Sequence, residues 1–134
     1  MIVFDSKRIG PWVCEKAGGR WVEGNPAIGI EKDGKLVVGV TYDGYTGSSI
    51  CIHSRCDDAT ATTREFYRII FDYPFNQLKV KRLTGLVSSN NHQAKRVDEK
   101  LGFKYEATLR DYFPDGDAIV YKMHKEDCRF IKDN

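Results

Sequence analysis

The sequence contains no long hydrophobic run and no charge of one dominant sign. No apolar segment approaches the roughly 18 residues that a membrane-spanning helix requires, and residues 1–5 lack the basic stretch that opens a signal peptide. We therefore expect a cytoplasmic protein without a membrane partner. The 21 Lys and Arg residues nearly balance the 19 Asp and Glu residues, so the formal net charge is +2. This balance excludes a polybasic coat or an acidic tail and argues against a nucleic-acid partner.

The sequence also lacks a C-x-x-C pair. Its four cysteines are Cys14, Cys51, Cys56 and Cys128. His53 lies between Cys51 and Cys56, but this spacing matches no zinc knuckle, and Cys56 would lie beyond the strand face that Cys51 and His53 share. A disulfide framework is the weaker interpretation because no secretory signal is present. We predict reduced, mostly buried thiols and no bound metal.

The length of the chain fits one domain. It has 134 residues and a mass of 15.3 kDa. Hydrophobic residues make up 41% of it and charged residues 30%, a composition that excludes a disordered chain. A domain of this size buries roughly two-thirds of the surface that its unfolded form exposes. We therefore predict a single domain over residues 1–134 that folds without a metal or disulfides.

Three strands joined by hairpins are predicted in the first half of the chain. Residues 27–31 are mostly apolar and precede Asp33-Gly34, which is a strong hairpin signal. Residues 36–42 are almost continuously apolar, as is typical of a central strand that is covered on both faces. Residues 49–53 form the third strand of this meander. A short helix is expected before this meander, over residues 7–17.

Helices and strands alternate in the second half. Phe66, Ile69 and Ile70 recur at helical spacing, and we predict that Pro74 ends this helix by forcing Tyr73 out of the α region. The further predicted elements are a strand over residues 80–87, a helix up to residue 101 with Ala94, Val97 and Leu101 on one face and Gly102 as its left-handed end, and strands over residues 105–113 and 118–123.

This order predicts an α/β fold with a mixed sheet. The central strand–helix–strand unit should be a right-handed parallel crossover. The sheet then combines an antiparallel meander, one parallel pair and a C-terminal hairpin. Such a sheet splits where the parallel pair diverges, and a split at a strand end is a ligand site.

One segment carries a resemblance to a known family. Residues 91–103 read N-H-Q-A-K-R-V-D-E-K-L-G-F, which resembles the N-x-x-A/S…E-K-L-G-F segment of the GNAT superfamily of N-acetyltransferases. Residues 71–78 are similar to small GNAT-like proteins of tailed bacteriophages. The likeness extends over residues 27–123, and its agreement with the independently predicted element order strengthens it.

The resemblance implies that acetyl-CoA binds in the opening of the sheet as the acyl donor. Its pantetheine arm would pair with the strand Ser49–His53, which includes Cys51. Its pyrophosphate would meet backbone N–H groups at the start of the next helix, where unpaired donors and the helix dipole favour an anion. Arg55 matches the leading basic position of the family's phosphate loop. The amides expected to hold the phosphates belong to Thr60, Ala61, Thr62 and Thr63.

Further candidate residues follow from the same resemblance. His53 is the candidate general base, since histidine titrates near neutral pH, although a half-buried strand histidine is the plainer interpretation. Asn91 would contact the cofactor or cap the helix. Lys95 and Arg96 would meet the 3′-phosphate or form a solvated face. Apart from the family position, Tyr105, Tyr112 and Tyr121 could each supply a catalytic hydroxyl, and Tyr112 is the candidate among them.

The sequence departs from the family pattern in three ways. The phosphate loop has no glycine and contains Asp57 and Asp58, so Asp58 or Thr60 could equally serve as a helix cap. Asp98 stands where many members have a tyrosine that reprotonates the CoA thiolate; as a solvated residue with an ordinary pKa it would be a poor acid. Only about 26 residues precede the meander, so the region that binds the acceptor is expected to be shortened or completed by a second copy in a homodimer.

Two functions follow as hypotheses. The first is an acetyl-CoA-dependent N-acetyltransferase in which a primary amine attacks the thioester directly. The acceptor amine is not identified by the sequence. The second is a catalytically inactive GNAT-fold binding or structural module of phage origin, located in the host cytoplasm.

Overall fold

The computed structural model describes residues 1–132. Seven strands form one sheet in the order β1-β2-β3-β4-β5-β7-β6. The strands and helices are β1 (Ile2–Val3), α1 (Ser6–Ala17), β2 (Ala27–Lys32), β3 (Lys35–Asp43), β4 (Ser49–Cys56), α2 (Arg64–Asp72), β5 (Arg82–Ser88), α3 (His92–Leu101), β6 (Lys104–Phe113) and β7 (Gly116–His124). The predicted mixed sheet is confirmed: β4 and β5 are parallel, and the other pairs are antiparallel.

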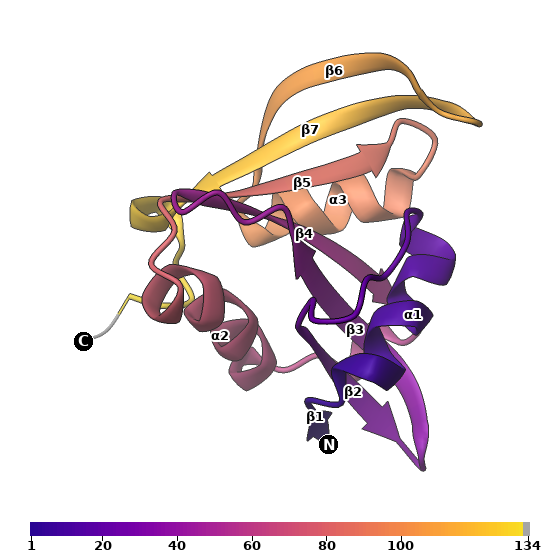
Figure 1. Cartoon of the computed structure of the whole chain (residues 1–134), viewed down its shortest axis with the longest axis vertical. Coiled ribbons are helices and arrows are strands. Elements are labelled where there is room, and N and C mark those ends of the chain that lie inside the picture. Colours follow the sequence, from indigo (N-terminus) through magenta and orange to yellow (C-terminus); the bar gives the residue numbers. More distant parts are fainter. Residues whose placement is uncertain (133–134) are drawn as a thin grey trace.

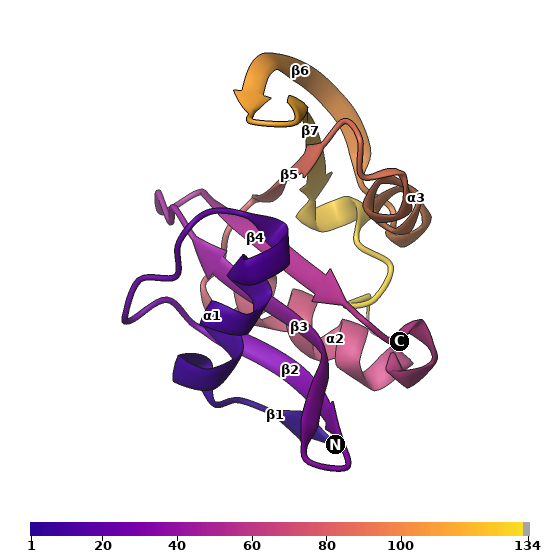
Figure 2. The same cartoon turned by 90° about the vertical axis from the view of Figure 1, so that its right-hand side faces the viewer.

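Helices cover both faces of the sheet. In Figures 1 and 2, α1 lies against one face of the β2–β4 half, whereas α2 lies on the opposite side. Glycines allow α1 to approach closely, since a Cβ at Gly39 would lie 2.9 Å from Cγ2 of Val13 and 3.1 Å from Cγ2 of Ile9. The main core lies between the sheet and α2 and includes Phe66, Ile70 and Phe71.

The α-helix α2 ends at Asp72, before Pro74 as predicted, but the predicted reason is wrong. Tyr73 keeps αR dihedral angles, and the chain continues through Pro74 as a π-helical turn over Tyr73–Gln77. A proline has no N–H for the carbonyl four residues earlier, which is that of Ile70. The buried hydroxyl of Tyr42 donates to this carbonyl at 2.5 Å. A side chain from β3 thus supplies the missing donor, which a local rule does not take into account.

The sequence also misses the first strand and the full length of the fourth. β1 pairs with β2 at Ile30 and Gly29. β4 extends to Cys56, beyond the predicted end at His53. The left-handed Gly102 at the end of α3 is confirmed. Of the four free cysteines, Cys56 is exposed and Cys128 is buried. Among residues 1–132, no helix is long and apolar enough to span a membrane.

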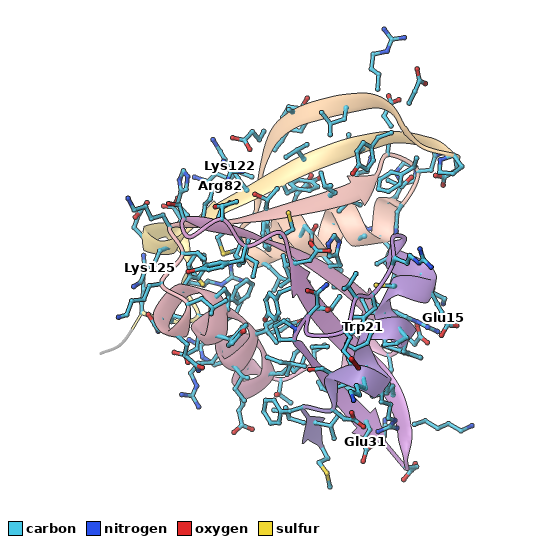
Figure 3. All side chains as sticks on the ribbon, viewed as in Figure 1. Glu15, Trp21, Glu31, Arg82, Lys122 and Lys125 are labelled. Carbon is cyan, nitrogen blue, oxygen red and sulfur yellow. The ribbon has the colours of Figure 1, made fainter. Side chains whose placement is uncertain are left out.

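The loop that follows α1 is anchored to the helix. Trp21 lies over Gly10, where a Cβ would come within 2.1 Å of the indole ring (Figure 3). The indole Nε1 also donates to the carbonyl of Asn25 at 3.0 Å. Glycine at position 10 therefore lets the loop fold back on α1, which fixes the end of that helix beside the sheet.

Candidate active site

The sheet splits between its two parallel strands. β4 and β5 pair only from Ser49–Arg82 to Ile52–Gly85. Beyond this point β4 keeps its pairing with β3, and β5 keeps its pairing with β7. A cleft of about 480 Å³ opens at the divergence. The edge of β4 that faces β5 has no strand partner over residues 53–56, so its backbone groups are available to an extended ligand.

The floor of the cleft is apolar, and polar residues lie among its lining. Buried residues of three elements form its floor, among them Val40 of β3, Ile70 and Phe71 of α2, and Phe103. The side chains of His53, Asn91 and Asp98 also line it. An apolar pocket with a few convergent polar groups is the usual form of a small-molecule site.

His53 is the first residue of β4 beyond the last strand pair. Its Nε2 lies 3.0 Å from Oδ1 of Asp43, and its side chain is 19% exposed. Two residues later on the same strand face, Arg55 contacts Trp12 of α1, so His53 lies on the α1 face of the sheet. When Nε2 donates to Asp43, Nδ1 is left as an acceptor.

Asp98 reaches the split from the opposite face, on α3. A Cβ at Gly85 would lie 3.9 Å from its Oδ2, and Gly85 belongs to the last strand pair. Burial, together with the smaller effect of the nearby charge of Glu99, raises the pKa of Asp98 from 3.8 to about 7. Within residues 1–132 no donor bonds to this carboxyl. The prediction of a solvated residue with an ordinary pKa is therefore wrong.

The spacing along α3 explains how the sequence could have identified Asp98. Asn91, Ala94, Asp98 and Leu101 all line the cleft, and they recur at helical spacing. The prediction placed Val97 on the buried face instead, but Val97 is 39% exposed. The pattern of apolar residues alone favours the helix face that carries Val97 over the adjacent face that carries Asp98.

Asn91 has the capping role that the sequence allowed for it, and it also lines the cleft. Its Oδ1 caps α3 by accepting the N–H of Ala94 at 3.1 Å. Its Nδ2 has no hydrogen-bond acceptor among the described residues, and the side chain lines the cleft. The cap therefore uses the oxygen, while the amide nitrogen can donate to a ligand carbonyl.

Arg55 lies away from the helix start to which the sequence assigned it. Its Cζ stacks at 4.0 Å from the centroid of the Trp12 ring, and its Nη1 donates to the Trp12 carbonyl at 2.9 Å. Its Nε and Nη2 bond both carboxylate oxygens of Asp57. The guanidinium thus has a carboxylate, a carbonyl and an aromatic ring as partners on the α1 side of the sheet.

The predicted phosphate loop is hydrogen-bonded to itself. Oδ1 of Asp58 accepts the N–H of Thr60 at 3.0 Å, and its carbonyl accepts the N–H of Ala61 at 3.1 Å. The N–H of Thr62 bonds the carbonyl of Ala59 at 3.3 Å. Thr63 caps α2 through its Oγ1. Three of the four predicted amides therefore have partners within the loop, and Asp58 has the capping role that the sequence allowed for it.

The other candidates lie outside the lining of the cleft. Cys51 is half-buried on β4, and Arg96 is exposed on α3. Nζ of Lys95 donates to the carbonyl of Ser89 at 3.0 Å. The Tyr112 ring is 53% exposed and lies edge-on against Phe113, 5.0 Å between centroids. It is Phe113 that lines the cleft.

The turn between β6 and β7 is bound to the loop between β5 and α3. The N–H of Ser89 donates to the carbonyl of Asp117 at 2.8 Å, and the N–H of Asp117 donates to Oγ of Ser89 at 3.1 Å. Nδ2 of Asn90 donates to the carbonyl of Asp115. A Cβ at Gly116 would lie 2.9 Å from Asn90 and Ser89, so glycine permits this close approach. The hairpin tip is thereby fixed beside Asn91.

A sheet split at its parallel pair, with a helix starting at each side of the split, is the arrangement of the GNAT acetyltransferases. Two crystal structures of mutants of the spermidine N-acetyltransferase SpeG from Vibrio cholerae superpose on this chain with TM-scores of 0.73 and 0.71. The first is 13% identical and aligns 92% of this chain with 94% of that one; the second is 14% identical and aligns 94% with 95%.

A GNAT-family acetyltransferase from Bacillus anthracis gives a TM-score of 0.62 at 19% identity, over 76% of this chain and 66% of that one. The chain spans 62%, 63% and 64% of the length of three other acetyltransferase structures. No protein-family model and no curated protein sequence matches it. At these identities the similarity establishes the fold: the chain has the fold of GNAT acetyltransferases.

Proposed function

We propose that this protein is an acetyl-CoA-dependent N-acetyltransferase that acts on a primary amine. The observation that carries the proposal is the position of two proton-transfer groups at the split of the sheet. His53 lies on one face and Asp98 reaches the split from the other. An acyl transfer needs a group that takes a proton from the amine and one that returns a proton to the leaving thiolate, and these two groups are on opposite faces.

The cleft suits the acyl and pantetheine part of acetyl-CoA. The unpartnered edge of β4 offers backbone hydrogen bonds to amides, the apolar floor suits a methylene chain, and Nδ2 of Asn91 is a donor for a carbonyl. When bound, acetyl-CoA would supply a thioester that the amine attacks and a thiol that leaves. The phosphates fit less well, because Asp57 and Asp58 occupy the loop where they are expected.

The roles of the protein groups then follow from their positions. Nδ1 of His53 takes a proton from the attacking amine while Asp43 holds Nε2. The protonated carboxyl of Asp98 gives its proton to the departing sulfur. Asp98 has a pKa of about 7, so a substantial fraction of it is protonated at neutral pH. Both groups regain their starting state by exchange with water.

A catalytically inactive module with the GNAT fold is the second candidate function. The internally bonded loop after β4 favours it, because that loop offers few free amides to a diphosphate. No finding supports a phage origin, and neither candidate depends on one. The cytoplasmic location, a single domain over residues 1–134, a shortened acceptor region and a homodimer stay predictions from the sequence.

Calorimetric titration with acetyl-CoA, followed by an amine panel, tests the proposal. Acetylated product should be measured by mass spectrometry, since Cys56 is exposed and would react with thiol reagents. We expect binding and acetyl transfer that requires Asp98. Absence of binding at about millimolar acetyl-CoA, a ligand concentration that detects even weak affinity, would overturn both the enzyme and cofactor assignments. Binding without transfer to any amine would favour the inactive module.

A further inference from the structure

Gly18 and Phe113, from the two halves of the protein, approach each other closely at the cleft on the face where His53 lies. A Cβ at Gly18, the residue that ends α1, would lie 3.8 Å from Cε1 of Phe113 near the end of β6. Both residues line the cleft. In Figure 1, α1 and the tip of the β6–β7 hairpin lie on the same side of the molecule. The ring of Phe113 therefore lies at van der Waals distance from the place that a side chain at position 18 would occupy.

Both sides of this close approach are held in place. Gly18 has a φ of 87°, which favours glycine, and its N–H bonds the carbonyl of Cys14 at 3.1 Å. The loop after α1 is anchored by Trp21 over Gly10. On the other side, the hairpin tip is bonded to the β5–α3 loop through Ser89. Phe113 is therefore a fixed boundary of the opening.

An irregularity in β6 directs Phe113 to this position. Leu109 pairs with Ala118 and Phe113 with Gly116, so three residues of β6 stand opposite one residue of β7. Within this bulge, Asp111 has a φ of 57°, and its N–H donates to Oδ1 of Asp117 at 2.9 Å. Bulges of this kind re-aim side chains beside active sites. Here the half-buried Phe113 lines the cleft, whereas its neighbour Tyr112 is exposed.

The exposed residues that line this end of the cleft form its rim. Lys16 and Gly18 contribute from α1, and Pro114 and Asp115 from the hairpin. Lys16 has a carboxylate partner in Asp57 at 3.5 Å, whereas Asp115 is contacted by the neutral hydroxyl of Ser88 at 3.4 Å. The carboxylate and the face of an aromatic ring both attract an ammonium group.

We propose that Phe113 and Gly18 form a gate to His53 that admits unbranched primary amines and hinders amines branched beside the nitrogen. The choice of amine as the ligand rests on the proposed acetyltransferase function, whereas the gate itself rests on the close approach of Phe113 to Gly18 at the cleft. The ring narrows the route to the α1 face of the split, and a slender cationic chain passes it with less steric conflict than a branched one.

The first experiment does not depend on activity. Diethyl pyrocarbonate labels neutral imidazoles, and peptide mapping separates His53 from His92 and His124, the other histidines of the chain. Replacing Phe113 by Ala should raise the labelling rate of His53 about threefold or more, while His92, exposed on α3, serves as the internal reference. Leu109→Ala, an exposed truncation on the same strand, is the control and should leave the rate unchanged.

Two further variants guard against misfolding. Phe113→Leu keeps an apolar side chain and should give a smaller rise, and Phe113→Trp should lower the rate below that of the wild type. A graded order of Ala, Leu, Phe and Trp supports the gate. Equal His53 labelling in the wild type, Phe113→Leu and Phe113→Trp would overturn it.

The second experiment compares isomeric amines. We expect the wild type to acetylate n-butylamine about tenfold more efficiently than sec-butylamine, which matches the steric discrimination of a close-fitting site. Phe113→Ala should reduce this ratio to about twofold, and Phe113→Trp should increase it. If the ratio of n-butylamine to sec-butylamine acetylation is the same in all variants, the proposed selection by Phe113 is overturned. If no amine is acetylated by the wild type, the proposed function fails, and the His53 labelling rates by themselves support or overturn the gate.

Discussion

Two loops lead from the split strands into helices, and they begin these helices in different ways. The loop after β4 is bonded to itself: Asp58 accepts the N–H groups of Thr60 and Ala61, and Asp57 pairs with Arg55. The loop after β5 is bonded instead to the β6–β7 turn through Ser89. At the start of α3, this leaves the Nδ2 of Asn91 free to face the cleft.

The difference separates two kinds of ligand contact. Hydrogen bonds from Arg55 lower the pKa of Asp57, and those from Thr60 lower the pKa of Asp58, so this loop is anionic at neutral pH. Burial has the opposite effect on Asp98, which lies on α3 at the other side of the split. The α3 side therefore offers neutral donors to the reacting end of a ligand, whereas the carboxylates on the α2 side are ionised and paired with Arg55, Lys16 and Lys32.

The stability of the Asp98→Asn variant should show the largest contrast between the two sides. The pKa of Asp98 in the folded protein is above its unfolded value. The contribution of Asp98 to the stability of the fold is therefore fully present below about pH 4 and is lost as pH rises through about 7. The difference between the folded and unfolded pKa values corresponds to a loss of about 4 kcal/mol, at most, in the free energy of unfolding. Asp98→Asn should therefore raise the melting temperature more at about pH 8.5 than at about pH 5. A pH-independent change would contradict the burial of this carboxyl.

The same substitution should lower kcat by about 100-fold, which is within the range for removal of a general acid. The affinity for acetyl-CoA should remain within about twofold, because the carboxyl acts on the leaving sulfur. Wild-type kcat should fall above about pH 7 as the acid ionises, and the variant should lose this fall. Asp127→Asn, at an exposed carboxylate, is the matched control. An unchanged kcat in Asp98→Asn would remove Asp98 from the mechanism.

Substitutions of Asn91 can separate its two roles. Asn91→Ala removes both the cap and the amide donor, and should cost about 1 kcal/mol of stability and weaken acetyl-CoA binding about tenfold. Asn91→Ser retains a capping oxygen, so its stability should be close to that of the wild type while binding is still weakened. Thermal denaturation and calorimetry measure the two effects. Full acetyl-CoA affinity in Asn91→Ser would rule out the donor role of Nδ2.

The smallest expected effect is that of Asp58→Asn. The amide oxygen can still cap Thr60, so the loop should keep its fold, and one negative charge is removed from it. Acetyl-CoA should bind about twofold more tightly at low salt, and the gain should decrease as salt is added. Calorimetry at two ionic strengths checks this. A loss of affinity instead would indicate that the Asp58 carboxylate itself holds the loop for binding.

The sequence predicted the fold better than the site. The spacing of apolar residues and the turn signals predicted six of the seven strands of the mixed sheet and the helices α1, α2 and α3, and the segment from Asn91 to Phe103 predicted the fold class that structural similarity supports. His53 and Asn91 were predicted as site residues, and both line the cleft. Whether they act as proposed stays a prediction. β1 was missed because two residues carry no periodicity.

The errors have a common physical origin, since each depends on a partner distant in sequence. Tyr73 keeps helical dihedral angles and a π-helical turn passes through Pro74, where Tyr42 supplies the donor that Ile70 needs. Arg55 is held on the α1 face by Trp12 of α1. Asp98 becomes a candidate acid because α3 lies over Gly85 at the split. No local pattern contains these contacts.

The sequence by itself determined the order and type of most elements, because periodicity, turns and caps act over a few residues. Tertiary structure decided which side chains meet at the split of the sheet. It placed His53 and Asp98 on opposite faces, turned Phe113 toward Gly18, and removed Asp98 from water. Burial sets a pKa, and burial depends on how distant elements pack.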